Sequence, residues 1–355
     1  MRKPFGLIIR ILAGILLILI LGFAGFLGFL TLREYSPGLT EKLSLKGRAG
    51  PLPGSKKNFS FFTWNIGYGG IGKEMDFFYE GGARVRPEKE EFQQYFEGIC
   101  ETIKQFDSAD FIFIQEIDLN AKRSYYTNEE SAIMSKLPGF CSAFAKNYDC
   151  EYIPIPVFDP MGGVQSGLAT ISKFTPASAE RIAYTADFSW PQKLFFLKRC
   201  FLVMRFPLEN GKELVVVNTH NSTYDKTGKL RKSEFIKLQG FLREEYNEGN
   251  YVICGGDWNN NPRGFDPGKV TSGDLAQPIE TPIDSAFLSG WQFVSDPRTP
   301  TDRLLDIIYI KGKTITTIID FFVLSPNVSL QEAKTIPMDF EFSDHNPVFM
   351  KVVLN

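Results

Sequence analysis

The sequence predicts an α/β protein in which β-sheets pack against one another under a cover of helices, behind a single N-terminal transmembrane helix. Three observations support this. Many segments are rich in β-branched and aromatic residues, as strands are. Two segments have the apolar spacing of an amphipathic helix, and the chain begins with a long apolar run. Many strands with few strong helices favour packed sheets over a barrel with a helix after every strand.

The apolar run covers residues 11–32, contains no charge and is long enough to cross about 30 Å of hydrocarbon as a helix. It is a membrane anchor or a long signal peptide. We favour an uncleaved anchor over residues 1–32, because the run exceeds a signal-peptide core of roughly 7–15 residues and no clean cleavage site follows. Arg2, Lys3 and Arg10 favour a cytoplasmic N-terminus and an extracytoplasmic domain, although basic residues between positions 33 and 48 compete.

Residues 33–57 contain several Gly and Pro residues among scattered charges and are expected to form a linker. No second change of composition follows, so residues 58–355 are expected to form one domain. Of the 39 basic residues, three precede position 33, which leaves 36 against 41 acidic residues in the rest of the chain. This balance gives no broad cationic face and weakens nucleic acid as a partner without excluding it.

The strands and helices of this domain follow from the same patterns. The expected strands are residues 59–65, 110–115, 167–172, 200–206, 213–218, 251–254, 304–310, 318–324 and 347–353. One expected helix follows Pro87 and carries Phe92, Phe96, Ile99, Ile103 and Phe106 on one face; the other precedes Gly249 and carries Phe235, Leu238 and Leu242.

Polar groups gather where these strands end, in places that hydrophobic packing alone does not explain. They are Asn65 in FFTWN, Glu116 in FIFIQE, His220 in VVVNTH, Asp257 and Asn259 in VICGGDWN, Asp320 in IID, and Asp344 and His345 in SDHN. Any one of them is ordinary for a turn. The set, however, includes both histidines of the chain, and together the groups predict one functional site. Gly255 and Gly256 are expected to let the backbone turn tightly there.

The donor types indicate the chemistry of this site. Carboxylates and amides without cysteine suit Mg²⁺, with Mn²⁺ or Ca²⁺ possible, rather than zinc. One such ion, two imidazoles and a carboxylate base are what the attack of water on a phosphate ester requires.

The ordered motifs TWNIGY, IQEI, NTH, GGDWN, IIDFF and SDHNP resemble those of the endonuclease/exonuclease/phosphatase superfamily, which includes DNase I-like nucleases, inositol polyphosphate 5-phosphatases and bacterial sphingomyelinases. The resemblance implies a four-layer α/β sandwich of two packed mixed β-sheets flanked by helices. It spans Asn65 to His345, nearly the whole expected domain.

The resemblance also implies a role for each motif residue. Glu116 would be the main metal ligand, with Asn65 beside it and Asp344 completing the metal environment. Asp257 would orient or deprotonate the attacking water, and Asn259 would hold a phosphate oxygen. His345 would contact the phosphate, Asp320 would fix its tautomer, and His220 would donate to the phosphate or the leaving group.

Two other motifs are set aside. Residues 67–72 fit G-x-G-x-x-G, but Gly81, Gly82 and Pro87 interrupt the helix that a dinucleotide site needs. Of the five cysteines, Cys141 and Cys150 could close a loop in an oxidising compartment; buried free thiols are the simpler interpretation for all five.

The substrate is left open between three hypotheses, none of which includes a protein partner. The first is a membrane-anchored phosphoesterase acting on a lipid head group or small phosphoester; the aromatic residues at 188–197 would meet the bilayer or pack in the core. The second is a surface nuclease that uses Lys226, Lys229, Arg231 and Lys232, a run that also fits a solvated helix face. The third is a non-catalytic binding protein with the same fold.

Overall fold

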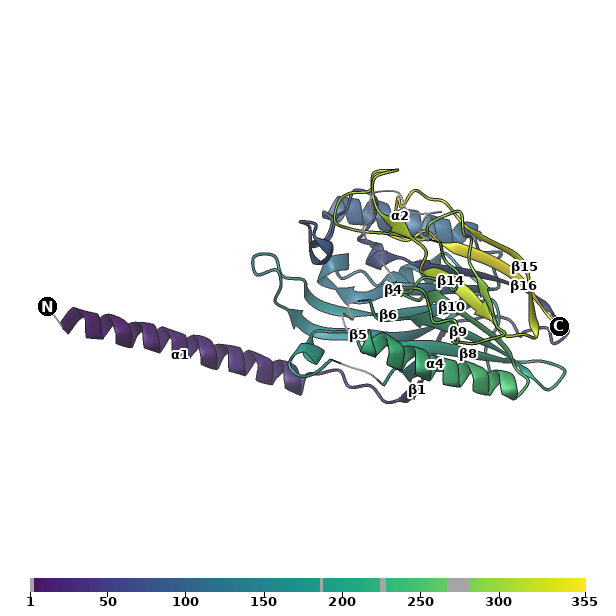
Figure 1. Ribbon diagram of the computed structural model, residues 1–355, viewed down its shortest axis with the longest axis horizontal. Helices are drawn as coiled ribbons and strands as arrows, with labels where there is room; N and C mark the ends of the chain where they lie inside the picture. Colours follow the sequence, from purple (N-terminus) through teal and green to yellow (C-terminus); the bar gives the residue numbers. More distant parts are fainter. Residues whose placement is uncertain (1–2, 186–187, 224–227, 267–280) are drawn as a thin grey trace.

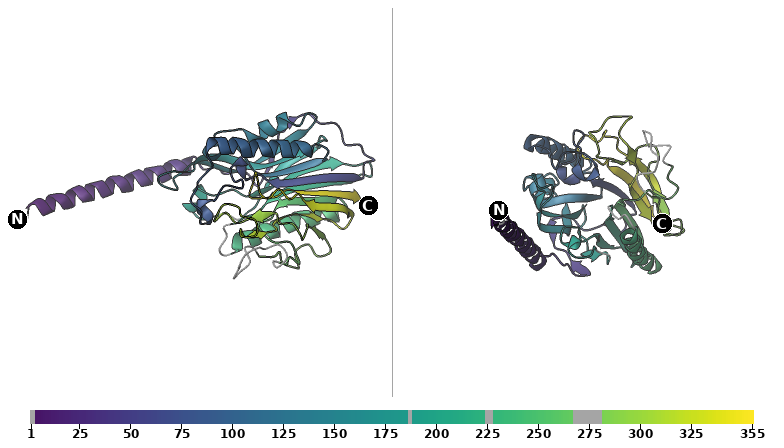
Figure 2. Two further views of the ribbon diagram at one scale, coloured as in Figure 1. Left: turned by 90° about the horizontal axis from the view of Figure 1, so that it is seen from above. Right: turned by 60° about the vertical axis from the view of Figure 1, so that its left-hand side comes forward.

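Two seven-stranded mixed β-sheets form the body of the protein in the computed structural model, which describes residues 3–185, 188–223, 228–266 and 281–355 (Figures 1 and 2). The first sheet has the order β1 (Thr40–Lys42), β7 (Ser178–Ala183), β8 (Cys200–Pro207), β9 (Glu213–His220), β10 (Tyr251–Asp257), β14 (Asp320–Leu324), β11 (Gln292–Val294). The second has the order β15 (Val328–Thr335), β16 (Val348–Leu354), β3 (Asn58–Asn65), β4 (Phe111–Ala121), β6 (Gly162–Ser172), β5 (Cys141–Ile153), β2 (Leu45–Gly47).

The remaining elements are short or lie outside the sheets. The helices are α1 (Lys3–Leu32), α2 (Lys89–Gln105), α3 (Glu129–Ser135) and α4 (Lys229–Asn247), and the 3₁₀ turns are η1 (Gly67–Gly69), η2 (Phe78–Glu80), η3 (Lys122–Ser124) and η4 (Gln192–Leu194). Strands β12 (Asp302–Arg303) and β13 (Thr316–Thr317) pair with each other.

Side chains that alternate along each strand produce the layers. In β3, Phe61 points into the core between the sheets, whereas Trp64 packs on the side of α2. In β9, Val216 faces the same inter-sheet core and Val217 faces α4. The helices therefore cover the outer faces of both sheets, α2 on one and α4 on the other, as Figure 1 shows. The predicted four-layer α/β sandwich is confirmed.

Both expected helices and all but one of the expected strands are confirmed. The exception is residues 304–310, which were predicted as a strand and form an irregular segment instead. Its backbone bonds the loop that follows β3: Phe77 N–H donates to Leu305 O at 2.8 Å, and Tyr309 N–H donates to Lys73 O at 2.9 Å. Leu305 is buried against Tyr68. The segment looked like a strand because it is rich in Leu and Ile, but only Leu305 is buried, while Ile307, Ile308 and Ile310 are exposed and no strand pairs with them.

The expected linker at residues 33–57 is wrong in part. Strand β1 pairs with β7 at one edge of the first sheet, and β2 pairs with β5 at the edge of the second. Edge strands are short and polar, so a sequence such as Thr-Glu-Lys contributes backbone hydrogen bonds without showing an apolar pattern.

Helix α1 leaves the domain as a long rod (Figures 1 and 2). Its segment Gly6–Leu32 is long and apolar enough to cross a membrane. Only its last turns reach the domain, where Leu27 and Leu30 are buried against Leu194.

All five cysteines are free and buried. Cys141 and Cys150 lie nine residues apart on the single strand β5, which separates them by roughly 30 Å at the rise of a strand, far beyond the reach of a disulfide. The loop closure considered for this pair is therefore excluded.

Candidate active site

The carboxyl ends of β3, β4, β9 and β10 meet at one edge of the sandwich, because β3 and β4 are parallel in one sheet and β9 and β10 are parallel in the other. A cavity of about 350 Å³ opens there. Its lining includes Asn65, Glu116, His220, Asp257, Asn259, Asp344 and His345. Asp320 lies behind His345 and contacts its ring. The structure thus brings together every residue predicted for the site, from positions 280 apart in the chain.

Asp257 is at the centre of this group and is buried. Asn65 Nδ2 donates to its Oδ2 at 3.0 Å, and the backbone N–H of Asn259 donates to its Oδ1 at 2.9 Å. His220 Nε2 lies 3.3 Å from Oδ2, beside the same oxygen as Asn65. Asn259 has a positive φ of 47°, and its side-chain amide donates to Asn221 O at 2.8 Å and to Asp257 Oδ2 at 3.3 Å.

The two glycines before Asp257 do not form the expected tight turn, because both lie inside strand β10. A Cβ on Gly255 would meet the ring of Phe322 at 2.2 Å. A Cβ on Gly256, whose φ is +135°, would meet Thr219 O at 2.1 Å. The glycines are there because neighbouring strands approach closely, and this approach holds Asp257 level with His220 and Asp320.

Burial dominates the acidity of Asp257 and raises the pKa of its carboxyl group to about 7. The charge of His345 opposes this rise, while the charge of Asp320 adds to it. A carboxylate with this pKa can accept a proton near neutral pH, as a general base must.

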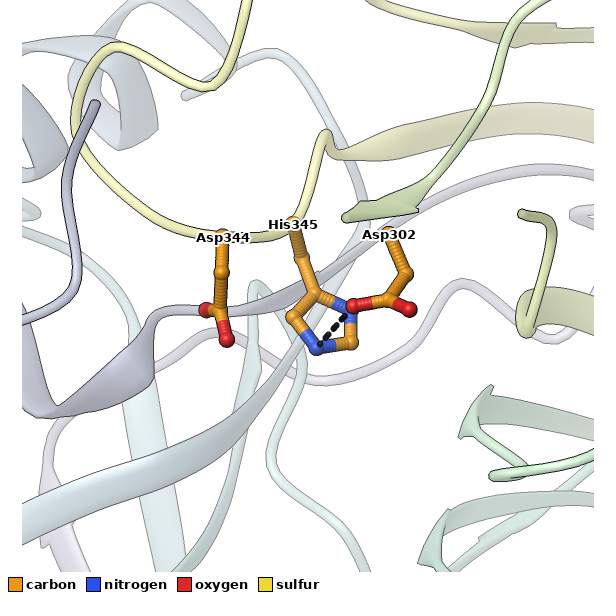
Figure 3. Close-up of side chains that lie close together, drawn as sticks. All are labelled: Asp302, Asp344 and His345. Carbon is orange, nitrogen blue, oxygen red and sulfur yellow. Dashed lines mark ion pairs between the residues drawn. The ribbon is translucent and has the colours of Figure 1, made fainter. Parts of the chain in front are cut away.

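His345 is held between two aspartates. Its Nδ1 lies 2.7 Å from Asp320 Oδ2, and its Nε2 lies 3.5 Å from Asp302 Oδ1. Figure 3 shows Asp302 and Asp344 on either side of the ring, with the ion pair to Asp302 dashed. The side chain of Trp64 holds the backbone of His345 in place, since Trp64 Nε1 donates to His345 O at 2.8 Å.

The pKa values of the two histidines shift in opposite directions. Burial by itself lowers the pKa of His345, but the charges of Asp320, Asp344 and Asp302 outweigh it and raise the pKa well above its usual value. For His220, burial lowers the pKa well below its usual value, and the charges of Arg199 and His345 lower it further. At neutral pH, His345 is therefore an imidazolium and His220 a neutral imidazole.

The carboxylates around the cavity form a donor set that fits a hard divalent cation. Glu116 sits at a bulge of β4 with a positive φ of 53°, which turns its side chain out of the sheet and into the cavity. Burial, followed by the charge of Glu116, raises the pKa of Asp344, and burial raises that of Asp302. Asp302, Asp344 and His345 each offer a ligand atom within 4.8 Å of the others. Oxygen donors dominate this set, as Mg²⁺ prefers.

Asn65 lines the same cavity, and its side chain contacts Asp257 and Gly67. Its amide nitrogen is bonded to Asp257, and its amide oxygen accepts from Gly67 N–H at 3.0 Å. These contacts make Asn65 a positioning residue for Asp257.

Among the cavity-lining residues that sequence reasoning missed are Tyr68, Arg199 and Asp302. The hydroxyl of Tyr68 is buried and has no hydrogen-bond partner within the part of the chain that the structure describes. Arg199 Nη1 lies 3.5 Å from His220 O. In the sequence, Asp302 could be noticed only as an acidic residue next to an expected strand, and such residues are common in turns. No sequence pattern points to Arg199.

The basic run proposed for nucleic acid lies partly at this edge. Arg231 Nη1 donates to Asn259 O at 3.4 Å, Lys229 begins α4, and Lys226 lies outside the described residues.

Comparisons with known proteins agree with this fold. The structure resembles the endonuclease/exonuclease/phosphatase from Beutenbergia cavernae, with 15% identity, a TM-score of 0.57 and coverage of 84% of this chain and 72% of that one. It resembles the human nocturnin catalytic domain, with 12% identity, a TM-score of 0.52 and coverage of 88% and 97%.

It also resembles ANGEL2, a 2′,3′-cyclic phosphatase, with 14% identity, a TM-score of 0.55 and coverage of 88% and 98%. No match was found among curated proteins. Residues 62–345 match the Endonuclease/Exonuclease/phosphatase family, a span that includes every site residue from Asn65 to His345. The chain therefore belongs to that family.

Proposed function

We propose that this protein is a membrane-anchored, divalent-metal-dependent phosphoesterase that hydrolyses a phosphodiester or phosphomonoester by attack of an activated water. The observation that carries the proposal is the meeting in one cavity of a carboxyl group with a pKa of about 7, Asp257, and a charged imidazole, His345. The first can take a proton from water, and the second can neutralise charge on a phosphoryl oxygen.

Each residue has one task in this proposal. Asp257 accepts the proton of the attacking water, while Asn65 and the backbone of Asn259 hold its carboxylate in place. Asn259 and His345 donate hydrogen bonds to phosphoryl oxygens, and Asp320 keeps His345 charged. His220, neutral at pH 7, donates to the phosphate or the leaving group and has the ring nitrogen Nε2 next to Asp257.

Glu116 and Asp344 would hold the metal ion, with Asn65 as a further oxygen donor. Mg²⁺ is the expected ion, with Mn²⁺ or Ca²⁺ as alternatives; when bound, it supplies positive charge that neutralises the phosphoryl oxygens. The hard oxygen donors that line the cavity support this choice.

A lipid head group is the preferred substrate class. The cavity that contains the site residues also has apolar walls, among them Met161, Phe195, Phe196 and Leu197. Helix α1 supports anchoring of the same chain in a membrane. Arg2, Lys3 and Arg10 before the apolar run favour the extracytoplasmic side for the domain.

The alternative is a surface nuclease. Its support is Arg231, which contacts the backbone of Asn259 and stands near the place where a phosphate would bind. A non-catalytic binding protein is the least favoured reading, since it gives no reason for the matched set of donors around Asp257.

The test is a substrate panel with the full-length protein and Mg²⁺: sphingomyelin, phosphoinositides, plasmid DNA and bis-p-nitrophenyl phosphate. We expect hydrolysis of lipid and of the synthetic diester. Nicked DNA with untouched lipid would overturn the lipid assignment in favour of the nuclease. If no substrate is hydrolysed, and the Asp257→Asn variant is the same as the wild type in every measured property, the hypothesis of a non-catalytic binding protein is the one that remains.

A further inference from the structure

The loop that joins β5 to β6 carries apolar side chains far into solvent. Within Tyr152–Phe158, the side chains of Ile155 and Val157 are 40% and 76% exposed, and Phe158 is 100% exposed. Trp190, in the segment before η4, is 55% exposed. Single exposed apolar residues are normal, but a group containing Phe, Val, Ile and Trp marks a surface that is normally covered.

This group lies beside the end of α1. The ring of Phe26 stands edge-on to Tyr152, with centroids 6.3 Å apart, and Trp190 Nε1 donates to Thr31 Oγ1 at 3.1 Å. In Figure 1 the loop between β5 and β6 projects from the same side of the domain as the helix. We call Tyr152, Ile155, Val157, Phe158 and Trp190 the docking surface.

Two ion pairs join the residues directly after α1 to the domain. Arg33 contacts Glu151 at 2.7 Å, and Lys198 contacts Glu34 at 3.1 Å, where both side chains are largely buried. A few residues later the chain pairs with β7 as strand β1. A membrane that holds α1 therefore also orients the docking surface.

The length of α1 sets the depth of this surface. The apolar segment has 27 residues and is about 40 Å long at 1.5 Å per residue, whereas the hydrocarbon core is about 30 Å thick. Its last turns, which contact Tyr152 and Trp190, thus reach the head-group level. Tyr and Trp are the residues enriched at that level.

The docking surface is continuous with the catalytic cavity. Phe195 packs against Phe26 of α1, with centroids 6.4 Å apart, and also lines the cavity. Met161 lines the cavity too, and its N–H donates to Ile155 O at 3.0 Å, which ties the wall of the cavity to the exposed loop. Phe195 thus contacts both α1 and the cavity.

We infer that the docking surface sits in the head-group region of a lipid bilayer, so that the apolar wall of the cavity faces the membrane and admits phosphoesters that stay attached to it by an apolar chain. The inference rests on the proposed function for its catalytic part. The docking itself does not depend on catalysis, so the two can fail separately.

Docking is tested on the full-length protein reconstituted into phosphatidylcholine vesicles. Phe158→Cys is labelled with an environment-sensitive fluorophore; the native cysteines are all buried. The matched control is Ile236→Cys on α4, which is 62% exposed and outside the docking surface. We expect blue-shifted emission, quenched by nitroxide lipids, at position 158 and water-like emission at 236. Water-like emission at both positions would overturn the docking.

The catalytic part is tested with Val157→Ser/Phe158→Ser against Ile236→Ser. For lipid in vesicles, we expect the double variant to lose about tenfold in rate through lost apolar contact, with an unchanged rate on bis-p-nitrophenyl phosphate. Equal rates on vesicles for wild type and the double variant would overturn the inference, as would hydrolysis of the soluble diester or of DNA with no lipid hydrolysed. If wild type hydrolyses nothing, the proposed function fails, and the fluorescence result still decides the docking.

Discussion

At the residue scale, surroundings rather than residue type decide the role of each site group. The chain has two histidines, and the structure makes one charged and one neutral within a single cavity. The charges of three aspartates raise the pKa of His345, whereas burial, with the charges of Arg199 and His345, lowers that of His220. The motifs identified both residues, but their charge states depend on neighbours that come from other strands.

The pH dependence of the reaction should follow Asp257. Because its pKa is raised to about 7, the carboxyl group holds a proton below that pH and is an active base above it. We expect kcat/KM to rise about tenfold per pH unit below 7 and to level off above it. Asp257→Asn should lower the rate by several orders of magnitude while the circular dichroism spectrum stays native. A flat profile from acidic to alkaline pH in the wild type would contradict this assignment.

Substitution should distinguish the effects of Asp320 and Asp302 on the pKa of His345. Asp320→Asn removes the negative charge 2.7 Å from Nδ1, and Asp302→Asn removes the one 3.5 Å from Nε2. Since both charges raise the pKa of His345, each variant should lower it in an NMR titration, and Asp320→Asn should lower it more. We expect a 10–100-fold drop in kcat for Asp320→Asn, as for other residues that orient a functional group. Equal titration in the wild type and both variants would show that neither aspartate sets the charge of the ring.

At the element scale, the strands that sequence patterns identified are those buried on both faces. The central strands β3, β4, β9 and β10 are continuous apolar runs, because one face meets the other sheet and the opposite face meets a helix. Strands β5 and β15 were not predicted, since polar and charged residues interrupt their patterns. The position of such strands in the sheet depends on backbone pairing with a neighbouring strand, and a local sequence pattern does not show that pairing.

Gly255 allows a test of how closely β10 and β14 approach. Gly255→Ala would place a Cβ 2.2 Å from the buried ring of Phe322, so we expect a loss of about 1–3 kcal/mol in the free energy of unfolding. Gly240→Ala is the matched control in α4, where a Cβ meets nothing within 4 Å. It should stabilise the protein by up to about 1 kcal/mol, as alanine does inside a helix. Urea unfolding measures both; a neutral Gly255→Ala would show that the strands can separate at no cost.

At the scale of the whole molecule, the sheet edges depend on a segment that its composition suggested was a linker. Strands β1 and β2 close one edge of each sheet, and Tyr35 Oη donates to Lys146 O at 3.2 Å just before them. The folded domain thus begins close to the end of α1.

Truncation distinguishes this arrangement from a linker. A chain that begins at residue 33 should fold and hydrolyse bis-p-nitrophenyl phosphate at the wild-type rate. A chain that begins at residue 58 lacks both edge strands, so it should melt at a lower temperature and aggregate through the exposed edges. Identical melting temperatures and solubility for the two chains would mean that β1 and β2 contribute nothing to the domain.

Divalent cations should stabilise the site even without substrate. Asp344 is buried and Asp302 is half-buried, both carboxyl groups have raised pKa values, and Glu116 faces the same cavity. Mg²⁺ relieves the repulsion between these carboxylates, so Mg²⁺ should raise Tm and a chelator should lower it. Glu116→Gln should weaken Mg²⁺ binding in calorimetry at least tenfold. Unchanged Tm with and without Mg²⁺ would remove the metal from the proposal.

The sequence by itself determined the apolar N-terminal helix, the central strands, the two covering helices and the polar groups at the strand ends that line the cavity, because each leaves a local pattern: a long apolar run, a periodicity or a polar group at the end of a strand. Only the tertiary structure decided which histidine is charged, why β10 needs glycines, that Asp302 joins the site and that Phe195 connects it to α1. These features arise from contacts between residues far apart in the chain, and such contacts depend on distance and burial, which no local pattern contains.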